Sequence, residues 1–355
     1  MALNVEVLWQ RRLAAGVANL LPAYFALVMA TEIIAIASRL LGIPILDGFL
    51  LWVGVAVYVI LWGLTLLRLL RYFPNVLADL KNHARGPGFF TLVASTCVLG
   101  SALLVIVSAV TAAKVLWFLG IGLWVVVMYA FFTAVVIREE KPSLEMGING
   151  AWLIATVATQ SIAVLGAFLS PHFDQQRVPL LFFALCMYLL GCMLYLSIIT
   201  LIFYRVTFAP LTTAELTPPY WINMGAVAIT TLAGSTLILH AGQWPLLHEL
   251  LPFLKGFTLF FWSFGSWWIP LLFILGIWRH LVKRYPLTYD PQYWGMVFPL
   301  GMYTVCTIRL SQALALPFLL TVARGFLLLA LAAWLAAFIG LLRTLVQYAR
   351  GPASS

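Results

Sequence analysis

The stretch that decides the fold is residues 152–168, which read WLIATVATQSIAVLGAF and contain no charged side chain. Residues 221–239, WINMGAVAITTLAGSTLIL, have the same character. An α-helix needs roughly 20 predominantly apolar residues to cross the hydrocarbon core of a bilayer. Both stretches therefore predict helices that span a membrane.

The composition of the whole chain supports this interpretation. Of 355 residues, 64% are hydrophobic and only 9% are charged, whereas an ordinary soluble domain is about 25% charged. Soluble enzymes, nucleic-acid-binding domains and disordered proteins are poor interpretations of such a chain. The net charge of +9 does not indicate nucleic acid, because the basic residues form short clusters between apolar runs, as in polytopic membrane proteins. We expect an all-α integral membrane protein whose surroundings are a lipid bilayer.

Ten stretches are long enough to span, and the connections between them are short. We therefore expect ten transmembrane helices in a single polytopic membrane domain covering residues 1–355. The predicted spans are 18–41, 46–70, 89–110, 113–137, 150–170, 180–204, 220–241, 253–278, 292–313 and 316–342.

The basic residues predict the orientation. With ten spans, 14 of the 20 lysines and arginines fall on the side of the two termini, four fall on the other side, and Arg309 and Arg324 fall inside spans. Cytoplasmic loops carry the excess of Lys and Arg. We expect a multi-pass protein of the plasma (inner) membrane with both termini in the cytoplasm.

Odd-numbered and even-numbered spans differ in composition. The even spans are mainly Leu, Val, Trp and Phe, whereas the odd spans carry small and polar residues. This contrast favours an inner ring of odd helices around a passage, wrapped by an outer ring. For each single residue the alternative is that small and hydroxyl side chains let helices pack closely. The candidate pore-lining residues are Ser95, Thr156, Gln160, Asn223 and Thr230.

Several phrases in the spans resemble one family of membrane proteins. The chain resembles the tellurite-resistance/C4-dicarboxylate transporter (TDT) family, which is related to the slow-type anion channels of plant guard cells, from about Leu21 to Leu342. The phrases that carry the resemblance are LPAYFALVMATEI (21–33), WLIATVATQSIAV (152–164), TPPYWINMGAVAITTLAG (217–234), FWSFGSWWIPLL (261–272) and YWGMVFPLGMY (293–303).

The resemblance implies a fold, an activity and a gate. The fold is ten helices in five hairpins with pseudo-five-fold symmetry, with odd helices lining a central pore and a homotrimer with one pore per subunit. The activity is passage of small anions or weak acids, either C4-dicarboxylates such as malate or oxyanions such as tellurite. A phrase of the form W-x-x-x-F-P carries the plug of the related channels, and here it is Trp294, Phe298 and Pro299. Phe298 is thereby the expected gate.

Two charged residues inside the spans are further candidates. A carboxylate in a span is a functional-site hypothesis by default, so we place Glu32 in the pore, either paired with Arg309 or Arg324 or kept protonated by desolvation. The alternative is a structural ion pair. Arg309 follows Phe298 by 11 residues, which puts both on one helix face. Because the first and ninth helices are neighbours in a closed ring, we expect Glu32 and Arg309 to meet.

Four functions compete on these residues. A channel needs a pore and a gate, whereas a proton-coupled carrier needs a titrating group, for which Glu32 is the candidate. An intramembrane enzyme needs a nucleophile and a base within reach, and the sequence shows no such set. A purely structural subunit leaves the polar inner helices unexplained. We expect no cofactor and no metal, since the four cysteines lack CxxC spacing and the histidines form no HExxH pattern.

Overall fold

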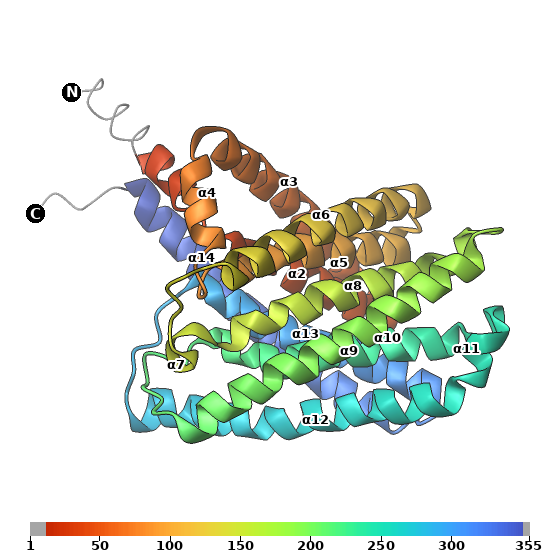
Figure 1. Ribbon diagram of the computed structural model, residues 1–355. Coiled ribbons are helices and arrows are strands. Elements are labelled where there is room, and N and C mark those ends of the chain that lie inside the picture. Colours follow the sequence, from red (N-terminus) through yellow and green to blue (C-terminus); the bar gives the residue numbers. More distant parts are fainter. Residues whose placement is uncertain (1–11, 351–355) are drawn as a thin grey trace, which may run out of the picture.

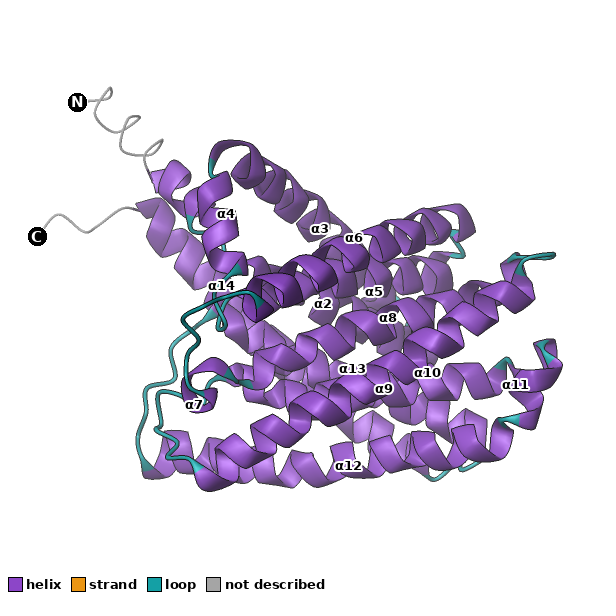
Figure 2. Cartoon of the chain, in the orientation of Figure 1, coloured by secondary structure: helices purple, strands orange, loops and turns teal. Residues whose placement is uncertain are grey.

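The structure, a computed structural model, describes residues 12–350, with side chains as far as Tyr348. Residues 1–11 and 351–355, on which the prediction of cytoplasmic termini partly depends, lie outside it. Within the described residues every regular element is helical and no strand occurs (Figure 2). The predicted all-α integral membrane fold is confirmed.

Five inner helices form a closed ring. Each one starts with a short 3-10 turn, and in all but the third a proline occupies one of the first two positions of that turn, where the missing N–H has no helical partner to lose. α2 contacts α5, α5 contacts α8, α8 contacts α10, α10 contacts α13, and α13 returns to α2 (Figure 1). The inner helices are η1–α2 (Pro22–Phe25, Ala26–Leu40), η2–α5 (Gly86–Phe89, Phe90–Val107), η3–α8 (Gly150–Leu153, Ile154–Leu169), η5–α10 (Pro218–Trp221, Ile222–Leu239) and η8–α13 (Pro291–Tyr293, Trp294–Leu314).

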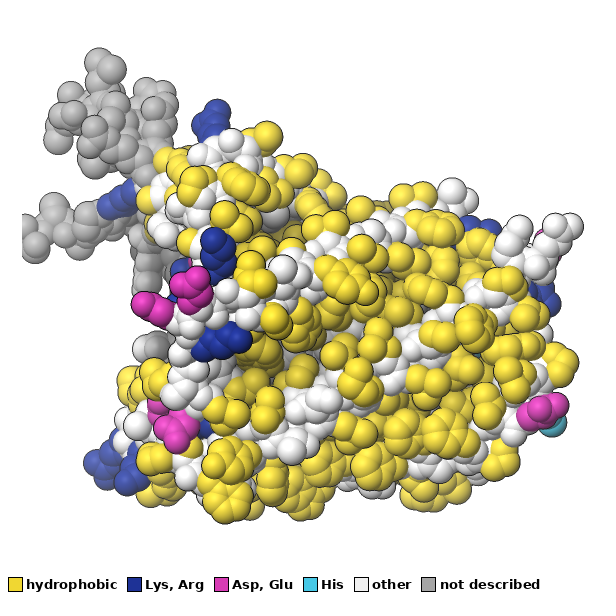
Figure 3. All heavy atoms as spheres, in the orientation of Figure 1, with side chains coloured by type: hydrophobic (Ala, Val, Ile, Leu, Met, Phe, Trp, Pro, Cys, Tyr) yellow, Lys and Arg dark blue, Asp and Glu magenta, His cyan; other side chains and the backbone are white. Residues whose placement is uncertain are grey.

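Five outer helices alternate with them along the chain and cover the ring. Buried residues make up 72–94% of the most apolar stretch of four inner helices but only 22–50% of the same stretch in the outer helices. On the side of the molecule seen in Figure 3, hydrophobic side chains cover the surface between the two ends, and charged ones gather at the ends. The outer helices are α3 (Leu46–Arg71), α6 (Val110–Val136), α9 (Arg177–Phe208), α12 (Leu251–Ile277) and α14 (Leu319–Arg350). The predicted division into odd inner and even outer helices is confirmed.

Short elements occupy the connections between the long helices. They are α4 (Phe73–Leu80), α7 (Leu144–Gly147), η4 (Ser170–His172), η6 (Ala241–Gln243), α11 (Pro245–Glu249) and the π-helical turn η7 (Trp278–Val282).

Nine helices within residues 12–350 are long and apolar enough to cross a membrane. The exception among the ten predicted spans is α13, which is 21 residues long but is diluted by glycines, Pro299, Arg309 and Gln312. An inner helix contacts protein on all sides, here α2, α10 and α14, so it does not need a lipid-compatible surface. Ten crossings therefore stay a prediction.

Hydrogen bonds from aromatic side chains join each outer helix to the inner helix of the next hairpin. The bond from Trp334 to Thr31 joins the last outer helix to the first inner helix and so closes the ring. The full set is Tyr58 with Thr96 (2.8 Å), Trp124 with Thr159 (2.9 Å), Tyr195 with the carbonyl of Asn223 (3.2 Å), Trp262 with Thr307 (3.0 Å) and Trp334 with Thr31 (2.9 Å). We call these five contacts the seam bonds.

The Trp334–Thr31 seam bond yields a stability prediction. Replacing Thr31 by valine keeps the volume but leaves the buried Trp334 Nε1–H without its acceptor, and a buried unpaired donor costs about 1–3 kcal/mol. We expect Thr31→Val to lower the melting temperature of the detergent-solubilised protein. The matched control is Thr200→Val on α9, since that exposed hydroxyl bonds only to its own helix. Equal melting temperatures for the two variants would show that the seam bond is dispensable.

Candidate functional site

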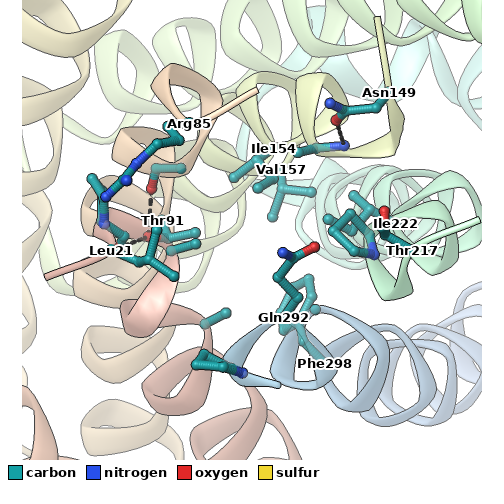
Figure 4. A pocket seen from close by; sticks show the side chains of 18 of the residues that line it. Leu21, Arg85, Thr91, Asn149, Ile154, Val157, Thr217, Ile222, Gln292 and Phe298 are labelled. Carbon is teal, nitrogen blue, oxygen red and sulfur yellow. Dashed lines mark hydrogen bonds between the residues drawn. The ribbon is translucent and has the colours of Figure 1, made fainter. Parts of the chain in front are cut away.

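A cavity opens at the end of the ring where the inner helices begin. Their 3-10 turns contact one another around a second closed ring and surround a space of about 260 Å³. Every inner helix contributes to its wall, and Gln292 and Phe298 lie toward its middle (Figure 4). We call this cavity the vestibule, its end of the molecule the vestibule end, and the opposite end the far end.

The electrostatics of the vestibule favour negative charge. Five inner helices start at its wall, and the N-terminus of a helix carries a partial positive charge. Arg85 also lines it. The carboxylate of Asp79 is shared by two arginines, Arg85 at 2.8 Å and Arg68 at 2.6 Å, so this trio retains a net positive charge. An anion entering the vestibule meets a favourable potential.

Phe298 lies at the inner limit of the vestibule. Its side chain lines the cavity, and the residue is 2% exposed. The following residue, Pro299, packs against α10 where Gly225 leaves room, since a Cβ there would lie 2.7 Å from Pro299 Cγ. Proline provides no N–H for the helix, so the carbonyl of Gly295, which also lines the vestibule, loses its usual donor. The structure thus places the ring of Phe298 at the vestibule, directly before a proline that packs against α10 and interrupts the helical hydrogen bonding.

Beyond Phe298 the space inside the ring becomes narrow and apolar. A space of about 10 Å³ continues there, which is no more than a single water needs. Its walls are aliphatic apart from Ser101, Ser161, Met302 and Phe168; the aliphatic residues are Ile33, Ile36, Val98, Val164, Ile229, Leu232 and Val305. A narrow apolar segment of this kind blocks ions by excluding water.

Arg309 lies at the far end of this narrow section. It follows Phe298, Met302 and Val305 at spacings of three or four residues, so the four side chains share one face of α13. The Cζ atom of Arg309 is 5.3 Å from the ring centre of Phe168, and its Nη1 donates to Gln312 Oε1 at 3.0 Å. We call the series of vestibule, Phe298, narrow section and Arg309, which follow one another along this face of α13, the conduit.

The structure contradicts the expected contact between Glu32 and Arg309. The Glu32 carboxyl lies against Gly54 of α3, where an added Cβ would overlap with Oε1, and neither oxygen has a hydrogen-bond partner among the described residues. Arg324 is exposed on α14. Glu32 thus faces α3 and is not among the residues that line the vestibule or the narrow section.

The five polar candidates also differ from expectation. Gln160 Nε2 donates to the Tyr188 carbonyl of α9 at 3.0 Å, and Gly191 leaves room for it, so Gln160 faces the outer ring. None of Ser95, Thr156, Gln160, Asn223 and Thr230 is among the residues that line the vestibule or the narrow section.

Hydrogen bonding within the helices accounts for part of this. The hydroxyls of Ser95 and Thr230 donate to carbonyls of their own helices, those of Leu92 and Ala226. In a helix such a bond satisfies the hydroxyl without any water-filled passage. Ser95 and Thr230 are therefore satisfied within their own helices, in keeping with the packing alternative for these two, whereas the buried side-chain polar atoms of Thr156 and Asn223 have no hydrogen-bond partner among the described residues.

Sequence reasoning identified Phe298 but missed most of the residues that line the vestibule and the narrow section. It searched for polar side chains, whereas most of the lining is apolar, as at Met29 and Ile33. For Met302 and Val305 the usable signal was helical spacing, because both lie between Phe298 and Arg309 on the same face of the helix. Arg85 and Gln292 lie at helix entrances, and only the meeting of the five helix starts makes them neighbours of the cavity.

Metal chemistry finds no support in the described residues: within them, no group of three or more His, Cys, Asp or Glu side chains is placed to hold a metal ion.

A closed ring of helices with a positive vestibule and an apolar barrier defines a membrane conduit. Residues 19–342 match the SLAC1 family, described as voltage-dependent anion channel. The chain belongs to this family, which confirms the resemblance found in the sequence.

Similar proteins include two uncharacterized transporters of Methanocaldococcus jannaschii. One is 30% identical over 300 residues, covering 80% of this chain and 82% of the relative, and the other is 28% identical over 304 residues, covering 81% and 84%. An uncharacterized membrane protein of Mycobacterium tuberculosis is 41% identical over 152 residues, covering 43% of this chain and 77% of the relative. The chain thus lies in a family of channels and transporters.

Cysteine labelling tests the placement of the two glutamines. Gln292 lines the vestibule, whereas Gln160 is buried against α9. In a background with the exposed Cys186 replaced by serine, we expect Gln292→Cys to react with a water-soluble thiol reagent and Gln160→Cys to stay unreacted, as measured by mass spectrometry in detergent. Comparable labelling at both positions would contradict the assignment of the vestibule.

Proposed function

We propose that this protein is a channel for small anions or weak acids, with the conduit along the axis of the inner ring. The observation that carries the proposal is the placement of Phe298 between a positive vestibule and a narrow apolar section. The substrates in this proposal are those that the resemblance implies, C4-dicarboxylates such as malate or oxyanions such as tellurite.

The preference for anions rests on the charges at the two ends of the conduit. The helix N-termini and the Arg68–Asp79–Arg85 trio favour negative charge at the vestibule end, and Arg309 does so at the far end. No carboxylate is among the residues that line either cavity. A cation channel instead uses rings of Asp or Glu.

The gate in this proposal is the ring of Phe298. Its burial in the axis, at the limit of the vestibule, obstructs passage of a hydrated ion. Opening then requires the ring to leave the axis, or α13 to move near Pro299. Because an inner helix contacts protein on all sides, such a movement must be accommodated by its neighbours α2 and α10.

The remaining parts of the proposal concern the setting of the channel. The excess of arginines at the vestibule end supports an orientation with this end in the cytoplasm of a cell with a plasma (inner) membrane. Assembly as a homotrimer, with one conduit in each subunit, rests on the resemblance to the related channels.

A proton-coupled carrier is the second candidate, and one observation favours it. The Glu32 carboxyl is fully buried and has no hydrogen-bond partner among the described residues, and such a group inside a membrane protein is typical of proton-relay sites. Its position against α3, behind the lining face of α2, separates it from a permeating anion. We therefore favour the channel.

Replacing Phe298 tests the gate. We expect Phe298→Ala to raise nitrate and chloride flux into proteoliposomes several-fold, because the ring that obstructs the axis is removed. The matched control is Phe261→Ala on α12, another fully buried phenylalanine. Each change lowers the free energy of unfolding by about 3–5 kcal/mol if it only leaves a cavity in the core. We expect Phe298→Ala alone to combine this loss of stability with a gain of flux. Unchanged flux in a folded Phe298→Ala protein would refute the gate, and Phe298→Leu provides a variant with less effect on folding.

Replacing Glu32 separates the channel from the carrier. In a channel, Glu32→Gln should leave anion flux and its dependence on pH unchanged, because the carboxyl lies outside the conduit. In a proton-coupled carrier, the same change should abolish the stimulation of flux by an imposed proton gradient. Flux measured with and without such a gradient decides between them, with malate and nitrate as the tested anions.

A further inference from the structure

The side chain of Arg309 crosses the inner ring. Arg309 belongs to α13 and Phe168 to α8, and these helices are not neighbours in the ring, because α10 lies between them. A contact of 5.3 Å from the guanidinium to the phenyl ring therefore spans the far end of the axis. Phe168 itself lines the narrow section, so Arg309 covers the end of the conduit.

The guanidinium has donors left over. Nη1 donates to Gln312, but Nε is buried and has no partner among the described residues. None of the ion pairs found among these residues includes Arg309. A partly buried cation without a carboxylate is unusual, because an unpaired buried polar group is costly. The unpaired Nε–H is therefore a donor that a bound anion can satisfy.

His240 follows α10, between α8 and α13 in the ring, and contributes little charge to this end. Burial, with a smaller effect from the positive charge of Arg309, lowers the pKa of His240. The lowered pKa favours the neutral imidazole, and its Nδ1 is engaged with the Thr236 carbonyl at 2.8 Å. Of His240 and Arg309, it is the guanidinium that brings positive charge next to Phe168.

We propose that Arg309 forms an anion-binding site at the far end of the conduit, and that this site accepts planar oxyanions and carboxylates. Nε and the adjacent Nη2 of a guanidinium present two parallel N–H donors, which match two oxygens of a carboxylate or nitrate. The ring of Phe168 holds the cation over the axis. A spherical anion such as chloride uses the charge but gains nothing from the fork. The inference rests on the proposed function and adds to it a residue that determines specificity.

Substitutions of Arg309 separate the contributions of fork and charge. We expect Arg309→Gln to raise the nitrate concentration for half-maximal flux about tenfold, the effect of losing charge-assisted hydrogen bonds. Lysine keeps the charge but loses the fork, so Arg309→Lys should weaken nitrate in the same direction while leaving chloride near the wild-type value. Arg324→Gln, which removes an exposed arginine on α14, is the matched control and should change neither anion.

Two measurements keep the site and the channel separable. One is flux of nitrate and chloride into proteoliposomes, in the wild-type and in the Phe298→Ala background. The other is stabilisation of the detergent-solubilised full-length protein by nitrate, since a ligand of the folded state raises its melting temperature. The melting temperature without nitrate shows whether each variant folds. If Arg309→Gln does not fold, Arg309→Lys is the variant that tests the site.

The outcomes are distinct. If the wild type passes nitrate and both Arg309 variants show the same dependence of flux on nitrate concentration as the wild type, the proposed anion-binding site is refuted and the proposed channel is not. A wild-type ratio of nitrate to chloride in Arg309→Lys overturns the role of the fork. If neither background passes either anion, the channel fails, whereas nitrate stabilisation that disappears with Arg309→Gln but persists with Arg324→Gln still supports the site.

Discussion

The structure depends on the seam bonds between each outer helix and the inner helix of the next hairpin. Within a bilayer the hydrophobic effect does not draw helices together, so packing of small residues and hydrogen bonds between helices must do so. Trp334 and Thr31 are 303 positions apart in the chain, and their bond joins its first and last hairpins. Because the bonds repeat around the ring, each hairpin is held by the next, and the inner helices stay parallel around a common axis.

This arrangement keeps most polar side chains of the inner helices away from the axis of the ring. The Thr230 hydroxyl bonds within its own helix and the Gln160 Nε2 amide bonds toward the outer ring, and the narrow section beyond Phe298 is lined mainly by Ile, Val and Leu, with Ser101 and Ser161 among its polar residues. An apolar axis excludes water without a covalent or charged plug, and it gives up little stability, since its side chains also pack as a core. Charge is then confined to the two ends, the vestibule and Arg309.

The arginines at the vestibule end have a structural role as well as a topological one. Arg205 Nε donates to the Glu145 carbonyl at 2.8 Å, and Arg279 Nη1 donates to the carbonyl of Leu216. These bonds tie outer helices to the loops that lead into inner helices. The residues that indicate orientation in the sequence thus also hold the entrances of the inner helices, and with them the wall of the vestibule.

The sequence by itself determined the class of structure. Apolar runs of membrane length, their alternation in polarity and the placement of basic residues led to the two-ring helical fold, whereas the family and the candidate Phe298 came from the resemblance of a few phrases in the spans. These features are local or periodic along the chain, so one sequence is enough to reveal them. Only the tertiary structure decided which way each polar side chain points. Glu32 and Gln160 look like pore residues in the sequence, yet they face outer helices because Gly54 and Gly191, on other helices, leave space there. Equally, Arg309 reaches Phe168 only because five helices close into a ring. A contact between helices that are not neighbours in the ring depends on how all five helices pack, and no local pattern of residues contains that information.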